Sequence, residues 1–195
     1  MTAELIHLML EAGLLQFGRF NHAGESVPFR LSLELLPSYP DILRMVAAQA
    51  KALLSSLEVS RLLCAADAVP FGVALSLEIN VPLVYSRRRS EAPVYDLVGA
   101  YDIGHPTLLM TNAVSDFEPL SQLMANARQV GLEVRNLLTI VDLDIVSIPH
   151  GIQQLSLLRL PDVIEDLTRS GHLPREQAQT VRHWMNAYAA GEAKY

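Results

Sequence analysis

A row of small and polar side chains follows a short apolar run near the middle of the chain. Residues 108–110 are all apolar, which is typical of a strand buried on both faces of a parallel sheet. Residues 111–116 are small or polar, and a helical spacing of apolar side chains then runs from Phe117 to a stop at Gly131. Because ligands of open α/β sheets bind at the carboxyl ends of strands, this loop is the first candidate site.

A second group with chemical potential is a run of three arginines, Arg87, Arg88 and Arg89, directly after the apolar run 81–85. The planar guanidinium fork is well suited to binding a phosphate or a carboxylate. Three adjacent cations at the end of a strand are also typical of a solvated edge. Both interpretations stay open, and the position beside a candidate anion site favours neither strongly.

Other groups of residues give weaker indications of a functional site. The six histidines lack the spacing with cysteine or carboxylates that a zinc site needs, so no protein-held metal centre is predicted. Cys64 is the single cysteine, which excludes an internal disulfide, and its apolar neighbours predict a buried thiol rather than a nucleophile. Asp142 and Asp144 follow a predicted strand and fit either a cation site or, more simply, a solvated strand end. Gly-x-Ser-x-Gly is absent, so a Ser-His-Asp triad cannot be argued.

Composition, net charge and the length of the apolar runs limit the class of protein. The chain has 195 residues, of which 50% are hydrophobic and 18% charged, so it can bury a sizeable core in one domain. The net charge of −6 argues against a nucleic-acid-binding surface. The apolar runs are too short to span a bilayer and the first residues do not resemble a secretory signal. A cytoplasmic protein without nucleic-acid or membrane partners is expected.

Hydrophobic periodicity predicts alternating strands and helices. Predicted helices cover residues 3–16, 41–54, 73–79, 117–130 and two closing segments that open near Pro161 and Pro174, and predicted strands cover 29–35, 59–65, 81–85, 108–110 and 134–141. Residues 67–72 are predicted as a loop and 94–101 as a hairpin. The fold class is therefore α/β, a mostly parallel sheet flanked by helices. Residues 1–195 form one predicted domain, with an N-terminal helix and strand hood (1–40), an α/β core (41–160) and two C-terminal helices (161–195).

The order of several segments resembles a known family. Five segments follow one another in the order found in type I phosphoribosyltransferases. They are Gly-Leu-Leu-Gln-Phe-Gly-Arg-Phe at 13–20, the segment 23–29, the loop 68–75, the strand and arginines 81–88, and Val98-Gly99. Within that group the chain is most similar to orotate phosphoribosyltransferase. The resemblance covers most of the chain and rests on order and spacing, because no single motif is intact.

The resemblance implies a glycosyltransferase of pyrimidine nucleotide metabolism, which joins orotate to phosphoribosyl pyrophosphate with Mg²⁺ and gives orotidine monophosphate. It also implies a homodimer and a phosphorylated small-molecule ligand. Arg87 and Arg88 are the implied catalytic candidates. The implied substrate- and phosphate-binding residues are Ser26, Phe71, Gly72, Thr111, Asn112, Ala113, Val114, Ser115, Asp116 and Phe117.

The departures from the family pattern bear on activity. An acidic pair of the family falls on Thr111 and Asn112, and Ser26 stands where the family has an orotate-contacting lysine. Asp116 and Phe117 occupy a turn that is otherwise rich in threonine and glycine. A carboxylate 4 Å from a phosphate charge would cost roughly 4 kcal/mol at an effective dielectric of 20. As an alternative role, Asp116 can cap the helix that follows.

The catalytic loop departs as well, since no lysine or histidine lies between Arg89 and Gly104. We therefore expect an orotate phosphoribosyltransferase-like protein with impaired or lost catalysis, which needs Mg²⁺ if active and otherwise no cofactor. The alternative is a non-catalytic paralogue that binds a nucleotide or another anion for regulation, or that serves as an oligomer partner.

Overall fold

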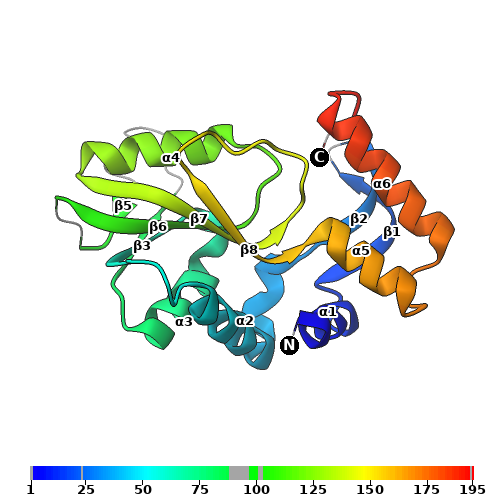
Figure 1. The fold of residues 1–195 in the computed structure, drawn as a ribbon, viewed down its shortest axis with the longest axis horizontal. Coiled ribbons are helices and arrows are strands. Elements are labelled where there is room, and N and C mark those ends of the chain that lie inside the picture. The colour runs from blue at the N-terminus through cyan, green and yellow to red at the C-terminus, as the bar shows by residue number, and fades with distance from the viewer. Residues whose placement is uncertain (1, 23, 88–96, 101–102, 194) are drawn as a thin grey trace.

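The computed structural model describes residues 2–22, 24–87, 97–100, 103–193 and 195. Within these residues a six-stranded sheet forms the centre of the molecule (Figure 1), with the order β5-β4-β3-β6-β7-β8. Neighbouring strands are parallel except for β4 and β5. The strands are β3 (Arg61–Cys64), β4 (Leu83–Ser86), β5 (Leu97–Val98), β6 (His105–Ala113), β7 (Leu132–Asp142) and β8 (Gln153–Arg159). The predicted α/β class with a mostly parallel sheet is confirmed.

Helices and a small second sheet surround this core. The helices are α1 (Thr2–Glu11), α2 (Pro40–Leu53), α3 (Val69–Ile79), α4 (Glu118–Gln129), α5 (Leu160–Arg169) and α6 (Arg175–Ala189), with short 3-10 turns η1 (Leu33–Ser38) and η2 (Ala66–Ala68). Strands β1 (Leu15–His22) and β2 (Glu25–Leu31) pair antiparallel. Figure 1 shows this hairpin with α5 and α6 at one end of the six-stranded sheet.

The apolar run at the centre of β6 is buried on both faces, as its sequence predicts. Leu108, Leu109 and Met110 are each 0% exposed. Leu109 packs in the core cluster that contains α4, whereas Leu108 and Met110 pack in the cluster on the opposite face. The register pairs β6 with β3 on one side and with β7 on the other. This central placement brings the end of β6 beside the ends of its neighbours.

Some elements differ from the sequence-based predictions. The first helix ends at Glu11 rather than at 16, because the chain turns through Gly13 with φ +69° and enters β1 at Leu15. The predicted loop 67–72 is instead η2 followed by the first turn of α3, where Pro70 suits the helix start. Strand β8 was not predicted, and half of the predicted hairpin 94–101 lies outside the described residues.

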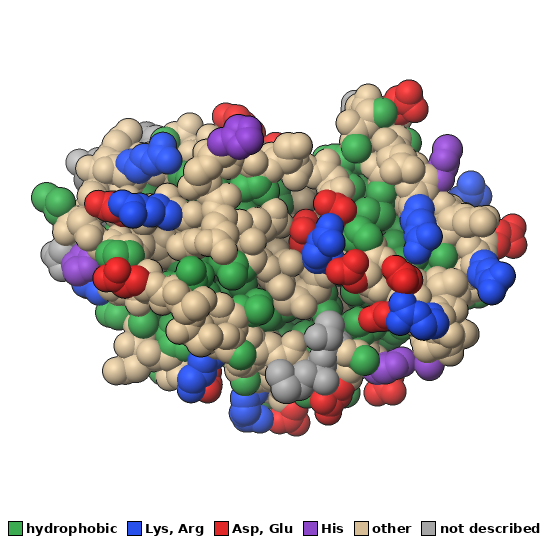
Figure 2. Space-filling view, in the orientation of Figure 1, with side chains coloured by type: hydrophobic (Ala, Val, Ile, Leu, Met, Phe, Trp, Pro, Cys, Tyr) green, Lys and Arg blue, Asp and Glu red, His purple; other side chains and the backbone are tan. Residues whose placement is uncertain are grey.

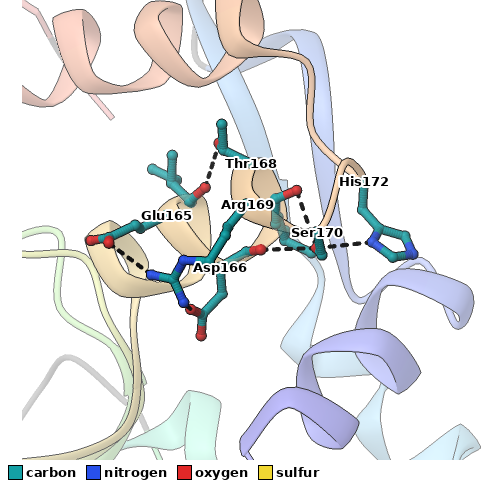
Figure 3. A network of polar contacts seen from close by, with 8 residues as sticks. Glu165, Asp166, Thr168, Arg169, Ser170 and His172 are labelled. Carbon is teal, nitrogen blue, oxygen red and sulfur yellow. Dashed lines mark hydrogen bonds and ion pairs between the residues drawn. The ribbon is translucent and has the colours of Figure 1, made fainter.

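The end of α5 is tied to the turn that leads into α6 (Figure 3). The Arg169 guanidinium bonds the carboxylates of Glu165 and Asp166 at 2.8 and 3.1 Å, and the Ser170 hydroxyl donates to the Asp166 carbonyl at 2.8 Å. His172 Nδ1 lies 3.0 Å from the same hydroxyl. Such exposed pairs contribute a few tenths of a kcal/mol each, so their main effect is to define the turn before α6.

The surface carries mixed charge. On the face shown in Figure 2, acidic and basic side chains are interspersed, without the basic stripe that is typical of a nucleic-acid-binding surface. None of the helices among the described residues combines the length and the apolar composition that crossing a membrane requires.

A close contact between α3 and β3 explains the glycine at position 72. A Cβ atom built on Gly72 would lie 2.1 Å from Cys64 Sγ and 3.1 Å from Leu83 Cδ1. Cys64 is a free, fully buried thiol, and burial, aided by the Asp67 charge, raises its pKa far above the usual range. The prediction that Cys64 is a buried thiol is confirmed, and Gly72 is required by the packing of α3 against β3.

We expect Gly72→Ala to lower the free energy of unfolding by about 1–3 kcal/mol, because the new methyl group overpacks the core against sulfur. Cys64→Ala removes that sulfur, so the double variant should recover part of the loss and the two effects should not add. Urea unfolding of the four proteins measures the coupling. Additive effects, or a Gly72→Ala protein as stable as the parent, would contradict this packing account.

Candidate functional site

A cavity of about 300 Å³ lies at the carboxyl ends of three neighbouring parallel strands. It opens where β3, β4 and β6 end, which is the place where open α/β sheets bind their ligands. Its polar lining comes from Asp67, Ser86, Thr111, Ser115 and Asp116, and its remaining lining from Ala65, Ala66, Ala113, Pro119, Leu120 and Leu123. The volume is at the lower end of the range of small-molecule sites.

Asp67 organises the edge of this cavity. Its Oδ2 atom accepts hydrogen bonds from Thr111 Oγ1 and from the backbone N–H of Asn112, each at 2.9 Å. The Asn112 side-chain amide donates in return to the Asp67 carbonyl at 2.8 Å. Thr111 and Asn112 are 4% and 8% exposed, so these bonds satisfy groups that water scarcely reaches. A carboxylate from the β3 side thereby fixes the end of β6.

Sequence reasoning missed Asp67 as a functional residue, because it was assigned to a loop without a role. A usable indication exists in the sequence. The buried strand β3 ends at Cys64, and Asp67 follows three residues later, at the same edge as Thr111. Since adjacent parallel strands end at one edge of a sheet, an acidic residue just after one strand can reach the end of its neighbour.

The loop after β6 serves both the cavity and the start of α4. The Asp116 Oδ1 atom accepts a hydrogen bond from the Glu118 backbone N–H at 3.0 Å. The N-cap position of α4 is Phe117 rather than Asp116, so Asp116 satisfies the first N–H of the helix from one residue before the cap. Val114 is 5% exposed and packs in the core with α4. Phe117 packs against the same core cluster and does not line this cavity. The bulk of Phe117 is therefore directed into the core.

The C-terminal helix reaches this loop. The Tyr188 hydroxyl in α6 donates a hydrogen bond to the Ser115 carbonyl at 2.5 Å. Burial, followed by the nearby Asp116 carboxylate, raises the pKa of Tyr188 above its ordinary value. The phenol therefore stays protonated at neutral pH and remains a donor.

The structure brings some of the sequence-predicted residues together and separates others. Thr111, Ala113, Ser115 and Asp116 line the cavity, and Asn112 adjoins it through Asp67. Ser26 is exposed on β2 and lines a separate groove of about 270 Å³ between the hood and α6. Phe71 and Gly72 lie within α3, and Phe71 is 1% exposed in the core.

The two arginine candidates are only partly described. Arg87 is exposed and directly follows Ser86, which lines the cavity at the end of β4. This position puts an exposed cationic side chain within one residue of the lining. Arg88 lies outside the described residues.

A cation site held by the protein alone is not found among the described residues, which contain no cluster of three or more histidine, cysteine or acidic side chains with suitable spacing. Asp142 and Asp144 instead pair with the Arg159 guanidinium at 3.7 and 3.1 Å. Within the cavity, the Asp67 carboxylate keeps one oxygen that takes no part in its bonds to Thr111 and Asn112. Mg²⁺ is commonly bound by one or two carboxylates together with substrate phosphates, so this donor set fits a Mg²⁺ ion that arrives with a pyrophosphate.

We expect Asp67→Ala to lower the free energy of unfolding by about 1–3 kcal/mol, because it leaves the Thr111 hydroxyl and the Asn112 N–H without their acceptor. Asp162→Ala is the matched control, since the Asp162 side chain is 64% exposed and contacts Arg159 only at 3.8 Å. Thermal or urea unfolding compares the two. Equal, small effects would show that the Asp67 contacts do not hold the end of β6.

The sequence matches no protein-family model, but it resembles curated relatives over most of its length. It is 28% identical over 165 residues to the orotate phosphoribosyltransferase of Archaeoglobus fulgidus, covering 83% of this chain and 90% of the relative. It is 25% identical over 184 residues to that of Chlamydia pneumoniae, covering 89% and 87%.

Solved structures agree on the fold. Leishmania donovani UMP synthase superposes with a TM-score of 0.83 and 27% identity, over 95% of this chain and 42% of that longer chain. Orotate phosphoribosyltransferase of Francisella tularensis superposes with a TM-score of 0.73 and 15% identity, over 94% and 98%. The Mycobacterium tuberculosis orotate phosphoribosyltransferase in complex with phosphoribosyl pyrophosphate superposes with a TM-score of 0.66 and 16% identity, over 83% and 98%. The chain is a relative of the orotate phosphoribosyltransferases and has the type I phosphoribosyltransferase fold.

Proposed function

We propose that this chain is an orotate phosphoribosyltransferase-like protein whose cavity at the end of β6 binds a phosphorylated ribose compound, and whose transferase activity is impaired. The observation that carries the proposal is the cavity itself, which is built from Asp67, Thr111 and the loop at Ser115 and Asp116. The relatives named orotate phosphoribosyltransferase support the substrate class. Phosphoribosyl pyrophosphate and nucleotides made from it are the ligands to test.

The cavity offers groups that suit a ribose phosphate. Asp67 uses Oδ2 for its two internal bonds, and its second carboxylate oxygen remains available to accept from a sugar hydroxyl. In the described part of the chain, the backbone N–H groups of residues 114–117 donate to no other group. Free N–H groups just before a helix are suited to phosphate oxygens. The site therefore has acceptors for hydroxyls and donors for a phosphate.

The charge of Asp116 weakens the site as a catalyst. The Asp116 carboxylate is exposed at the position where a phosphate would approach the loop. Its repulsion of a phosphate charge 4 Å away amounts to about 1 kcal/mol in bulk water and about 4 kcal/mol at an effective dielectric of 20. Stabilisation of a departing pyrophosphate would fall to Arg87 and to Mg²⁺, which Asp67 would hold and which would neutralise phosphate charge.

The second candidate function is non-catalytic binding, in which the chain holds a nucleotide or smaller anion for regulation or serves as an oligomer partner. The contacts at the loop favour it, because Asp116 bonds the first N–H of α4 and Tyr188 bonds the Ser115 carbonyl. Both contacts stabilise the loop without contributing to chemistry. Binding without turnover separates this candidate from a slow transferase.

We expect Asp116→Asn to bind phosphoribosyl pyrophosphate and ribose 5-phosphate about tenfold more tightly than the parent protein, whose binding should be weak. Asparagine removes the negative charge, yet its side-chain oxygen can still accept a hydrogen bond from the Glu118 N–H. A tenfold gain in affinity corresponds to about 1.4 kcal/mol of relieved charge repulsion. Calorimetric titration in the presence of Mg²⁺ measures both affinities.

Asp162→Asn serves as the control for that titration, because it removes one exposed charge far along the chain from the loop and should leave both affinities unchanged. Failure of parent and Asp116→Asn proteins, both shown to be folded, to bind either compound would refute the proposed ligand class. Equal affinities would show that the Asp116 charge does not limit the site.

A further inference from the structure

Tyr188 links the last helix of the chain to the loop that follows β6. It lies near the end of α6, 73 residues from Ser115 in sequence, and donates its hydroxyl proton to the Ser115 carbonyl at 2.5 Å. We propose that Tyr188 is a positioning residue that orients the loop 115–116 toward an anionic ligand. This inference rests on the proposed function, since it concerns the same cavity.

The Tyr188 ring is held in place before any ligand binds. Its ring centroid lies 5.3 Å from that of Trp184, one helical turn earlier in α6. Trp184 in turn contacts Phe29 of the hood edge-on, with the centroids 5.3 Å apart, and Tyr195 stacks on Phe29 at 5.6 Å. Aromatic pairs of this geometry add stability beyond simple burial. The hydroxyl is therefore presented to the loop by a packed cluster.

Because the peptide group is planar, the Tyr188 contact also sets the direction of the Asp116 N–H donor. The carbonyl of Ser115 and the N–H of Asp116 belong to one planar trans peptide, so they point in opposite directions. Because the carbonyl is directed at Tyr188 in α6, the Asp116 N–H is directed away from α6. Ser115 and Asp116 both line the cavity, and this N–H donates to no other group in the described chain.

The consequence is an N–H donor whose direction is set before a ligand binds. Without the Tyr188 bond the 115–116 peptide is free to rotate, and the ligand must then supply the free energy that orders it. The Asp116 carboxylate beside this donor keeps its own bond to the Glu118 N–H, so the two parts of the residue have separate partners. Tyr188 thus tunes affinity through the backbone, without contacting the ligand.

The test compares Tyr188→Phe with Tyr195→Phe, which removes a hydroxyl from the same aromatic cluster but not the one that reaches Ser115. Calorimetry with inorganic phosphate and with ribose 5-phosphate should give a Kd about five- to tenfold weaker for Tyr188→Phe, a typical effect of one lost hydrogen bond. The Tyr195→Phe protein should bind as the parent does. Thermal melting verifies that each variant is folded at the titration temperature.

A second readout follows the donor itself. In ¹⁵N–¹H spectra, added phosphate should shift the Asp116 backbone amide of the parent and of Tyr195→Phe, and should shift it much less in Tyr188→Phe. Equal affinities and equal amide shifts in all three proteins overturn the positioning role while the proposed function stands. Absence of binding and of amide shifts in every protein overturns the proposed function and this inference with it.

Discussion

The arrangement of the site depends on the hydrogen bonds that the Asp67 carboxylate accepts from Thr111 and Asn112. Strands β3 and β6 run parallel and pair as far as Cys64 and Met110, after which the Asn112 N–H has passed the end of its neighbour. Asp67 supplies the acceptor that the ladder no longer provides, at 2.9 Å. An acidic residue at position 111 would face this carboxylate directly, so the neutral threonine there fits its surroundings. The negative charge of the cavity edge therefore comes from the β3 side.

The loop after β6 shows how stability and ligand binding compete for the same groups. Asp116 at the start of α4 is favourable for the helix, because it caps the Glu118 N–H and complements the positive end of the helix dipole. The same charge is unfavourable for a phosphate that would use that helix start. Tyr188 secures the loop from the other side through the Ser115 carbonyl. The result is a well-ordered loop with reduced electrostatic attraction for anions.

The sequence predicted the parts of this structure that depend on local pattern. Hydrophobic spacing predicted the buried run in β6 and the helix α4. The helix stops before Gly131, as predicted, because this glycine adopts a left-handed conformation with φ +86°. The roles of Asp67 and Tyr188 were not predicted, because each depends on a partner 44 or 73 residues away. Strand β8 was missed because the adjacent pair Leu157 and Leu158 interrupts the alternation of its apolar residues. Its pairing with β7, rather than its own pattern, defines it as a strand. The assignment of Phe71 and Gly72 to a binding loop came from resemblance, whereas the structure places both inside α3.

The most direct measurement is the transfer reaction itself, followed by the absorbance change as orotate, phosphoribosyl pyrophosphate and Mg²⁺ give orotidine monophosphate. The orotate phosphoribosyltransferase of Archaeoglobus fulgidus, assayed in parallel, serves as the positive control. We predict turnover at least about 10²-fold slower than that of the control, since the loss of well-placed electrostatic stabilisation lowers the rate by that factor. Turnover comparable with the control would contradict the claim that the Asp116 loop impairs catalysis.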